Sequence, residues 1–213
     1  DNLQEKLNGE LPINRLELLY LVNSWGRDYD FYTNENIIIP KCEATQCYDL
    51  SKLDTSEITD MSQLFEYSMF NDIHSTNGIG LHNGDISNWN VSKVTDVSQM
   101  FYFARNFNQA LNSWDVRNVT NMSWMFSGAF NFNQDINNWD VSNVTTMYEM
   151  FYRAKEFNQA LNNWDVSKVT TMYGMFYGTT SFNQNINNWN VSNVTNMYMM
   201  FRDAIAFETK FNN

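Results

Sequence analysis

Residues 136–151 read INNWDVSNVTTMYEMF, and nearly the same letters return at 161–176 (LNNWDVSKVTTMYGMF) and at 186–201 (INNWNVSNVTNMYMMF). Four columns of large apolar residues keep the same step of 25 positions. They are Trp89, Trp114, Trp139, Trp164 and Trp189; Met100, Met125, Met150, Met175 and Met200; Phe101, Phe126, Phe151, Phe176 and Phe201; and Phe107, Phe132, Phe157, Phe182 and Phe207. A fixed period of this length is typical of a repeat array whose units stack and fold only together.

Each unit contains two apolar patterns that predict its secondary structure. Trp139 and Val141 alternate with polar neighbours, which is the period of a short strand with one buried side. With Ile136 they give the L-x-x-L-x-L form of a leucine-rich repeat. The residues that follow have the i, i+3, i+4, i+7 spacing of a short amphipathic helix: Met147, Met150, Phe151 and Ala154. We therefore predict an α/β repeat, namely a leucine-rich-repeat-like solenoid with one short parallel strand and one short helix per 25-residue turn.

The repeated part extends over residues 50–213 and gives about six turns. Its first unit is degenerate, because Leu53 stands where the other units have tryptophan. The step from Leu53 to Trp89 is 36 residues, so this turn carries an insertion, which we place near residues 74–84.

Residues 1–49 lack the repeat and contain an expected helix at 11–25 and an expected strand at 36–40. We interpret this part as an N-terminal cap over the first turn, with a separate adaptor module as the alternative. Cys42 and Cys47 lie within it. They form a small disulfide loop if the protein is secreted and stay free thiols in a reducing cell. The spacing has no second pair of zinc ligands, so we predict no metal site and no cofactor.

Stacking brings each column against its own copies in the neighbouring units. We expect the methionine and phenylalanine columns to form the core and the tryptophans to form a stack of indoles. One polar column is predicted to form an amide ladder that satisfies backbone groups at the bends: Asn108, Asn133, Asn158 and Asn183.

Helices pack about 8–10 Å apart and paired strands about 4.8 Å apart, so a helical convex side forces the array to bend around its strands. We predict that the outward residues of the concave strand face bind the ligand. The candidates are Asn90, Asp115, Arg117, Asn138, Asp140, Asn163, Asp165, Asn188 and Asn190.

Three of these candidates, Asp115, Asp140 and Asp165, occupy one column and allow two interpretations. Carboxylates about 5 Å apart repel one another unless a cation such as Ca²⁺ or a basic partner lies on them. Alternatively, each Asp accepts a bond from an amide of its own turn, for Asp140 that of Ser142 or Asn143. Asn90 and Asn190 in the same column favour this local role, because asparagine accepts the same bond.

The net charge of −11 argues against nucleic acid as a partner, since neutralising phosphates requires Lys and Arg. The charge is concentrated in residues 1–85, with a net −10, while residues 86–200 carry a net −1. No run of about 18 apolar residues predicts a transmembrane segment. The sequence does not indicate the oligomeric state. The array also has no set of catalytic side chains set apart from its repeats, so we predict no enzyme.

The pattern F-N-Q-x-I/L-N-x-W-D/N-V-x-x-V-T-x-M-x-x-M-F resembles the BspA-like leucine-rich-repeat family of microbial surface proteins, over about residues 50–211. The resemblance implies an extracellular or cell-surface protein, secreted or anchored outside this segment, without catalytic residues. Its expected function is cell adhesion or recognition of a host protein or glycan through the concave face. The alternative is a structural scaffold or protein–protein interaction subunit, virion-associated or cytoplasmic.

Overall fold

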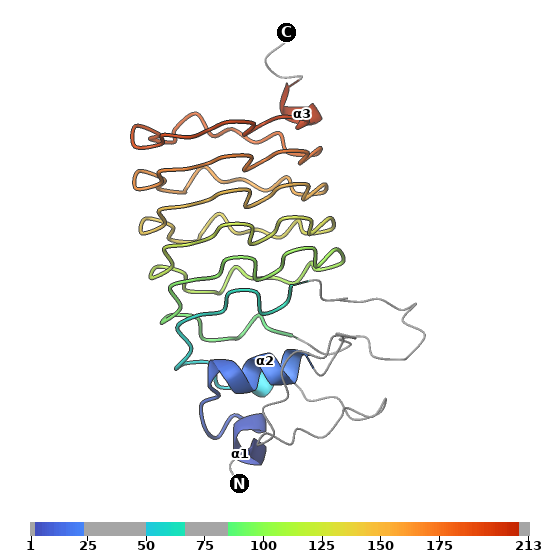
Figure 1. Ribbon diagram of the computed structural model, residues 1–213, viewed down its shortest axis with the longest axis vertical. Helices are drawn as coiled ribbons and strands as arrows, with labels where there is room; N and C mark the ends of the chain where they lie inside the picture. The colour runs from blue at the N-terminus through green and yellow to red at the C-terminus, as the bar shows by residue number, and fades with distance from the viewer. Residues whose placement is uncertain (1–2, 24–49, 67–84, 209–213) are drawn as a thin grey trace.

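The computed structural model describes residues 3–23, 50–66 and 85–208. Its helices are α1 (Leu3–Leu7), α2 (Arg15–Asn23), the 3-10 helix η1 (Leu50–Lys52) and α3 (Ile205–Glu208). From residue 85 to residue 204 the chain winds as coils of about 25 residues, which lie one above another in a nearly straight column (Figure 1).

Neighbouring coils run parallel, and each residue lies beside the residue 25 positions further along the chain. A column of isolated parallel β-bridges joins Asp96 to Asn121, Asn121 to Thr146, Thr146 to Thr171 and Thr171 to Asn196. The bridge from Asp60 to Asp96 continues this column to the degenerate first coil. The sequence period is therefore the spatial period of the stack.

The helix predicted at residues 147–154 was wrong, because this segment forms successive turns. Alternate N–H groups bond to the carbonyls of the next coil over 2.7–3.1 Å. The pairs are Met147 to Thr171, Glu149 to Tyr173, Phe151 to Met175 and Arg153 to Tyr177. Two residues of the segment, Glu149 and Arg153, have positive φ angles of 49° and 55°, which no α-helix contains. We call this set of bonds between neighbouring coils the N–H ladder.

The spacing between coils explains why the helix does not form. Equivalent phenylalanine rings, such as Phe126 and Phe151, have centroids 5.5–5.7 Å apart in successive coils. Packed helices need about 8–10 Å, so a helix in every coil does not fit this stack. Tight turns place Met147, Met150 and Phe151 inside just as a helix would, since all three are fully buried.

The strand predicted around Trp139 was also wrong, although its inward and outward residues were right. Trp139 and Val141 are buried, while Asn138 and Asp140 are exposed. The backbone makes turn bonds here instead, from Trp139 N–H to the Ile136 carbonyl and from Val144 N–H to the Val141 carbonyl. Because the described coils have no helical layer on one side, nothing forces them to bend. The predicted division into a concave and a convex face therefore loses its basis.

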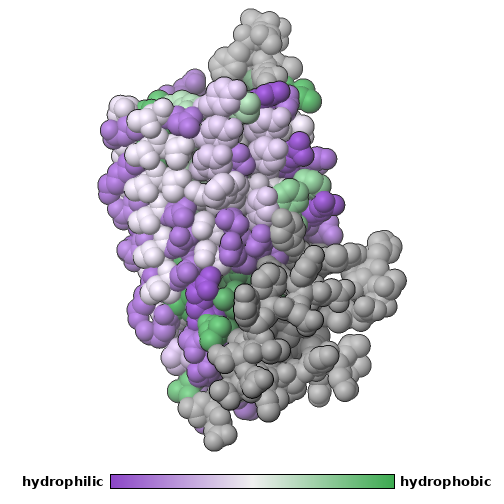
Figure 2. All heavy atoms as spheres, viewed as in Figure 1, coloured by the Kyte–Doolittle hydropathy of each residue, from purple (hydrophilic) through white to green (hydrophobic). Residues whose placement is uncertain are grey.

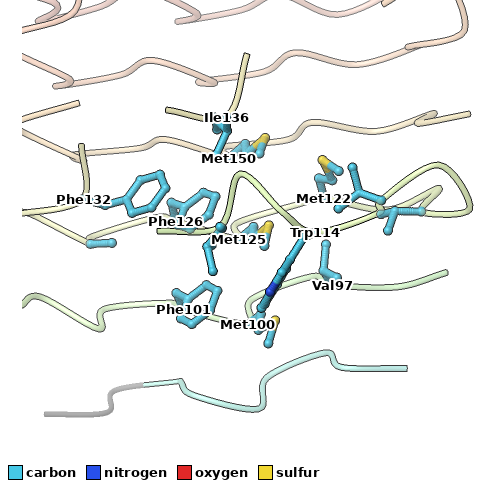
Figure 3. Close-up of a cluster of buried hydrophobic side chains, with 14 of the residues drawn as sticks. Val97, Met100, Phe101, Trp114, Met122, Met125, Phe126, Phe132, Ile136 and Met150 are labelled. Carbon is cyan, nitrogen blue, oxygen red and sulfur yellow. The ribbon is translucent and has the colours of Figure 1, made fainter. Parts of the chain in front are cut away.

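The interior is a set of side-chain columns that run along the stack, part of which is drawn in Figure 3. Phe101 and Phe126 contact the second phenylalanine column within their own coils, with centroids 3.9 Å apart. The indole N–H of Trp139 donates to the buried carbonyl of Leu111 in the preceding coil over 2.9 Å. Trp114 and Trp164 make the same bond to Ile86 and Ile136.

The predicted asparagine ladder is confirmed. The side-chain oxygens of Asn108, Asn133 and Asn158 each accept the backbone N–H of the asparagine one coil further on, over 2.8–2.9 Å. Glutamines one position later, Gln134 and Gln159, add a second bond to the same oxygens. The backbone N–H groups at the bends are thereby hydrogen-bonded to side chains that recur in every repeat.

The N-terminal segment lies against the first coil. Pro12 forms a parallel bridge with Asp54, and Arg15 donates to the carbonyls of Asp60 and Ser62 over 3.1 and 3.0 Å. The helix begins at Arg15 and not at the predicted residue 11, because Asn14 caps it through a 2.9 Å bond from the Glu17 N–H. The strand predicted at 36–40, the insertion near 74–84 and Cys42 and Cys47 lie outside the described residues.

Candidate ligand-binding face

The nine candidate residues lie on one side of the coils, beside the tryptophan column. We call this surface the Asn/Asp face: Asn90, Asp115, Arg117, Asn138, Asp140, Asn163, Asp165, Asn188 and Asn190. All are exposed except Asp115, which is half-buried. Each follows a buried or, at Ile186, half-buried apolar residue by one or two positions, so the core columns position the face.

The acids of the column accept hydrogen bonds within their own turns, which was one of the two interpretations of the sequence. Oδ1 of Asp140 accepts the Ser142 backbone N–H over 3.1 Å and the Ser142 hydroxyl over 2.6 Å. Oδ1 of Asp165 accepts the Ser167 N–H over 3.0 Å. The asparagines of the column do the same, with distances of 3.1 Å at Asn90 and 3.2 Å at Asn190. These are Asx turns, and asparagine replaces aspartate in them because only the accepting oxygen is needed.

The hydrogen bonds also change the protonation of the acids. The bonds from Ser142, first from its hydroxyl and then from its N–H, lower the pKa of Asp140 below its ordinary value. The Ser167 bonds lower the pKa of Asp165 in the same way. Both carboxylates are therefore ionised at neutral pH. The structure shows no group of three or more His, Cys, Asp or Glu side chains able to hold a metal ion in the part of the chain that it describes.

Arg117 is the departure from the pattern, since the other coils have serine at its position. Its Nε donates to Oδ1 of Asp115 over 2.7 Å, and its backbone N–H donates to the same oxygen over 3.3 Å. The bond to Asp115 raises the pKa of the Arg117 guanidinium. The charge of Asp115 is therefore compensated, whereas Asp140 and Asp165 have neutral serines as partners.

A shallow open depression lies in the middle of the Asn/Asp face and unites four of the predicted candidates. Asn138 and Asp140 from one coil and Asn163 and Asp165 from the next line it, together with Asn137, Trp139 and Val141. A second depression nearby includes the predicted Asn188 with Ala160, Asn162, Gln184, Asn185 and Asn187. The other four candidates, Asn90, Asp115, Arg117 and Asn190, line neither depression.

A second asparagine column, which the predicted site omitted, connects the coils at this face. The side-chain amide of Asn143 donates to the Arg117 carbonyl over 2.8 Å, and that of Asn193 donates to the Ser167 carbonyl over 2.6 Å. Asn118 repeats the bond to Ser92. The recurrence of asparagine at one repeat position was the sequence signal. These bonds hold neighbouring turns in fixed register, so the face is preorganised.

Aromatic side chains form two separate outer columns on the turns of the N–H ladder, one of Tyr148, Tyr173 and Tyr198 and one of Tyr152 and Tyr177. Tyr148 stacks on Tyr173 with centroids 4.8 Å apart, and Tyr152 stacks on Tyr177 at 4.9 Å. Each ring thus covers a face of its neighbour, and mainly ring edges meet solvent. Among these five tyrosines only Tyr198, at the end of the first column, is largely exposed, at 62%. Figure 2 shows how residues of similar hydropathy line up along the stack on one side of the molecule.

Comparison with known proteins places most of the chain in one family. The chain belongs to the family described as "Mycoplasma protein of unknown function, DUF285", whose model matches residues 38–77, 67–173 and 159–213. No curated protein and no solved structure matches the chain. The resemblance to BspA-like repeats is tested by none of these comparisons and stays a prediction. None of the described helices is long and apolar enough to cross a membrane.

Proposed function

We propose that this chain is a non-enzymatic recognition protein that binds a polar ligand, a glycan or a polar protein surface, through the Asn/Asp face. The observation that carries the proposal is the depression formed by Asn138, Asp140, Asn163 and Asp165 from two successive coils. It presents amide and carboxylate groups on a rigid backbone, a set that suits hydroxyl groups of sugars or amides of a peptide. Its place at a repeated position allows the same contact along several coils and hence multivalent binding.

Two of the four residues are available to a ligand without loss of a turn. Asn138 is exposed and its side chain makes no hydrogen bond to another described residue. Asn163 donates its backbone N–H to Oδ1 of Asn137 over 3.0 Å, and its side-chain oxygen accepts one long bond from the Asn162 amide over 3.5 Å, so its side-chain N–H groups remain for a ligand. Asp140 and Asp165 are partly engaged in their Asx turns and offer their second carboxylate oxygens.

The test is a binding screen of the purified chain against immobilised glycans and host-surface proteins. A double substitution, Asn138→Ala with Asn163→Ala, is compared with Glu156→Ala, which removes an exposed side chain of the same coil away from the face. We expect a hit whose affinity falls at least about tenfold in the double variant and is unchanged in the control. A hit that the double variant keeps would move the binding site elsewhere, and no hit at all would contradict the recognition function.

The proposed location is extracellular or at a cell surface, and the thiols test it. Titration of free thiols in the native purified protein, repeated after denaturation without reductant, reports on Cys42 and Cys47. Two blocked thiols that are released by reductant support secretion. Two free thiols favour the alternative, an intracellular or virion-associated scaffold or interaction subunit.

A further inference from the structure

Exposed asparagines extend the Asn/Asp face along the stack. From the coil of Trp89 to the coil of Trp189, each coil places at least one of them at one of two adjacent repeat positions. We call this set the amide strip: Asn88, Asn112, Asn138, Asn162, Asn163 and Asn188. Its members are exposed on interior coils as well as on the outer ones, so the strip belongs to the repeat and not to one coil.

Hydrogen bonds between coils hold the amide strip in place. Asn163 donates its backbone N–H to Oδ1 of Asn137 over 3.0 Å, and the side-chain amide of Asn137 donates to Oδ1 of Asn162 over 3.2 Å. Asn163 lines the first depression of the face and Asn162 lines the second. Because these two residues are neighbours in the sequence, the depressions adjoin and form one shallow polar surface across successive coils.

This surface offers hydrogen-bonding groups and no apolar anchor. None of the exposed large apolar side chains among the described residues occupies the positions of the strip. Trp139 and Val141, which line the first depression, are only 2% and 1% exposed. Protein interfaces usually depend on Trp, Tyr and Arg side chains that reach the partner. The amide strip therefore suits the hydroxyl groups of a sugar, each of which both donates and accepts, better than a protein surface.

The charges of the face favour an uncharged ligand. Asp140 and Asp165 each use one carboxylate oxygen in an Asx turn, and the other can accept a hydroxyl group of a sugar. The same carboxylates repel an acidic sugar. The cations beside them are already engaged, because Arg117 donates to Asp115 and Lys168 donates to Asn143, each over 2.7 Å.

We propose that the amide strip binds an uncharged, extended polysaccharide of β-1,4-linked sugars that lies along the stack. This inference rests on the proposed recognition function and names the ligand of the same face. The coils form a nearly straight column (Figure 1), so an extended sugar chain contacts one coil after another. A chain that winds into a helix leaves the strip after a few sugars. Affinity therefore grows with the length of the extended chain, because each added sugar makes new contacts within one binding event.

The experiment measures binding of neutral oligosaccharides to the whole chain by calorimetry. The probes are β-1,4-linked oligomers of glucose and of N-acetylglucosamine, from two to six sugars, and the α-1,4-linked glucose hexamer, which has the composition of its β-linked isomer. We expect at least one β-linked hexamer to bind at least about tenfold more tightly than its own dimer and than the α-linked hexamer.

Two results would overturn the proposal. One is equal binding of the α-linked and β-linked glucose hexamers, and the other is no binding of either β-linked hexamer up to about 10 mM. The binding screen separates this failure from a failure of the recognition function. A screen hit that the Asn138→Ala, Asn163→Ala variant loses would keep the function and reject only this ligand.

Substitutions far apart on the strip locate the sugar chain. Asn88 and Asn163 lie three repeats apart, and Glu156→Ala is the control on an interior coil away from the face. We expect Asn88→Ala and Asn163→Ala each to lower hexamer affinity at least about threefold, with dimer affinity changed less and circular dichroism unchanged. Hexamer affinity that is unchanged in both variants, or lowered equally by Glu156→Ala, would contradict the amide strip as the site.

Discussion

The coil that begins at Ile136 and the final coil that begins at Ile186 have nearly the same sequence but different surroundings. Val141 and Met147 are 1% and 0% exposed in the first, while Val191 and Met197 are 38% and 39% exposed in the second. The apolar pattern is the same, so the burial of a residue here depends on whether another coil covers it. A single coil therefore does not bury its own apolar side chains, and its stability depends on contacts with the neighbouring coils.

The largest expected effect concerns the phenylalanine column. Phe151 is fully buried between Phe126 and Phe176, whose ring centroids lie 5.7 and 5.6 Å away. Phe201 has only Phe176 along this column and is half-buried. We expect Phe151→Ala to lower the free energy of unfolding by about 3–5 kcal/mol, and Phe201→Ala by roughly half of that, because a cavity between two coils cannot fill with water as an end site can. Urea unfolding measures both, and equal losses would contradict the dependence on neighbours.

A smaller difference is expected in the tryptophan column. The indole N–H groups of Trp139 and Trp189 donate to Leu111 and Leu161 over 2.9 Å each. Trp139→Phe keeps most of the apolar ring but leaves a buried carbonyl unpaired, which we expect to lower the free energy of unfolding by about 1–3 kcal/mol. Trp189 belongs to the uncovered coil and is 8% exposed, against 2% for Trp139. The loss in Trp189→Phe should therefore be smaller. Urea unfolding of the two variants side by side measures both losses, and equal losses would contradict the dependence on burial.

The smallest expected effect concerns the acids of the Asn/Asp face. Because the folded-state pKa values of Asp140 and Asp165 are lowered from an ordinary value near 3.8, ionisation of these acids stabilises the folded state above that pH. The contribution is lost as the pH falls through the folded-state values. Both groups are exposed, so we expect less than about 1 kcal/mol from the pair. Unfolding of the double variant Asp140→Asn, Asp165→Asn should depend less on pH below about 4 than the native chain, and identical pH profiles would exclude this role.

One further comparison separates charge from hydrogen bonding on the same face. Asp140→Asn keeps an oxygen that accepts the Ser142 N–H, as Asn90 and Asn190 do in their own coils. Asp140→Ala removes that acceptor. If the proposed ligand recognises the carboxylate, both variants weaken binding, whereas a ligand held by the turn geometry binds Asp140→Asn normally. Affinity for the hit from the binding screen, measured for both variants, decides between these outcomes.

The sequence by itself determined the period, the buried columns and the asparagine ladder, because each depends on one residue type that returns every 25 positions. It favoured the acceptor role of residues such as Asp140 over a cation site, and the hydrogen bonds of the folded chain decided between the two. Only the tertiary structure decided the backbone conformation. Apolar residues at i, i+3, i+4 and i+7 fit a helix and fit successive tight turns equally well. Hydrogen bonds to carbonyls 24 residues further along the chain, and a distance between coils too small for helices, select the turns.

Two glycines within the expected helices were a sequence feature that agreed with turns. Gly128 and Gly178 have positive φ angles of 71° and 64°, which glycine adopts readily. Glu149 and Arg153 adopt the same left-handed conformation although they are not glycine. At these positions the hydrogen bonds of the N–H ladder fix the backbone conformation, and the residue type does not predict it.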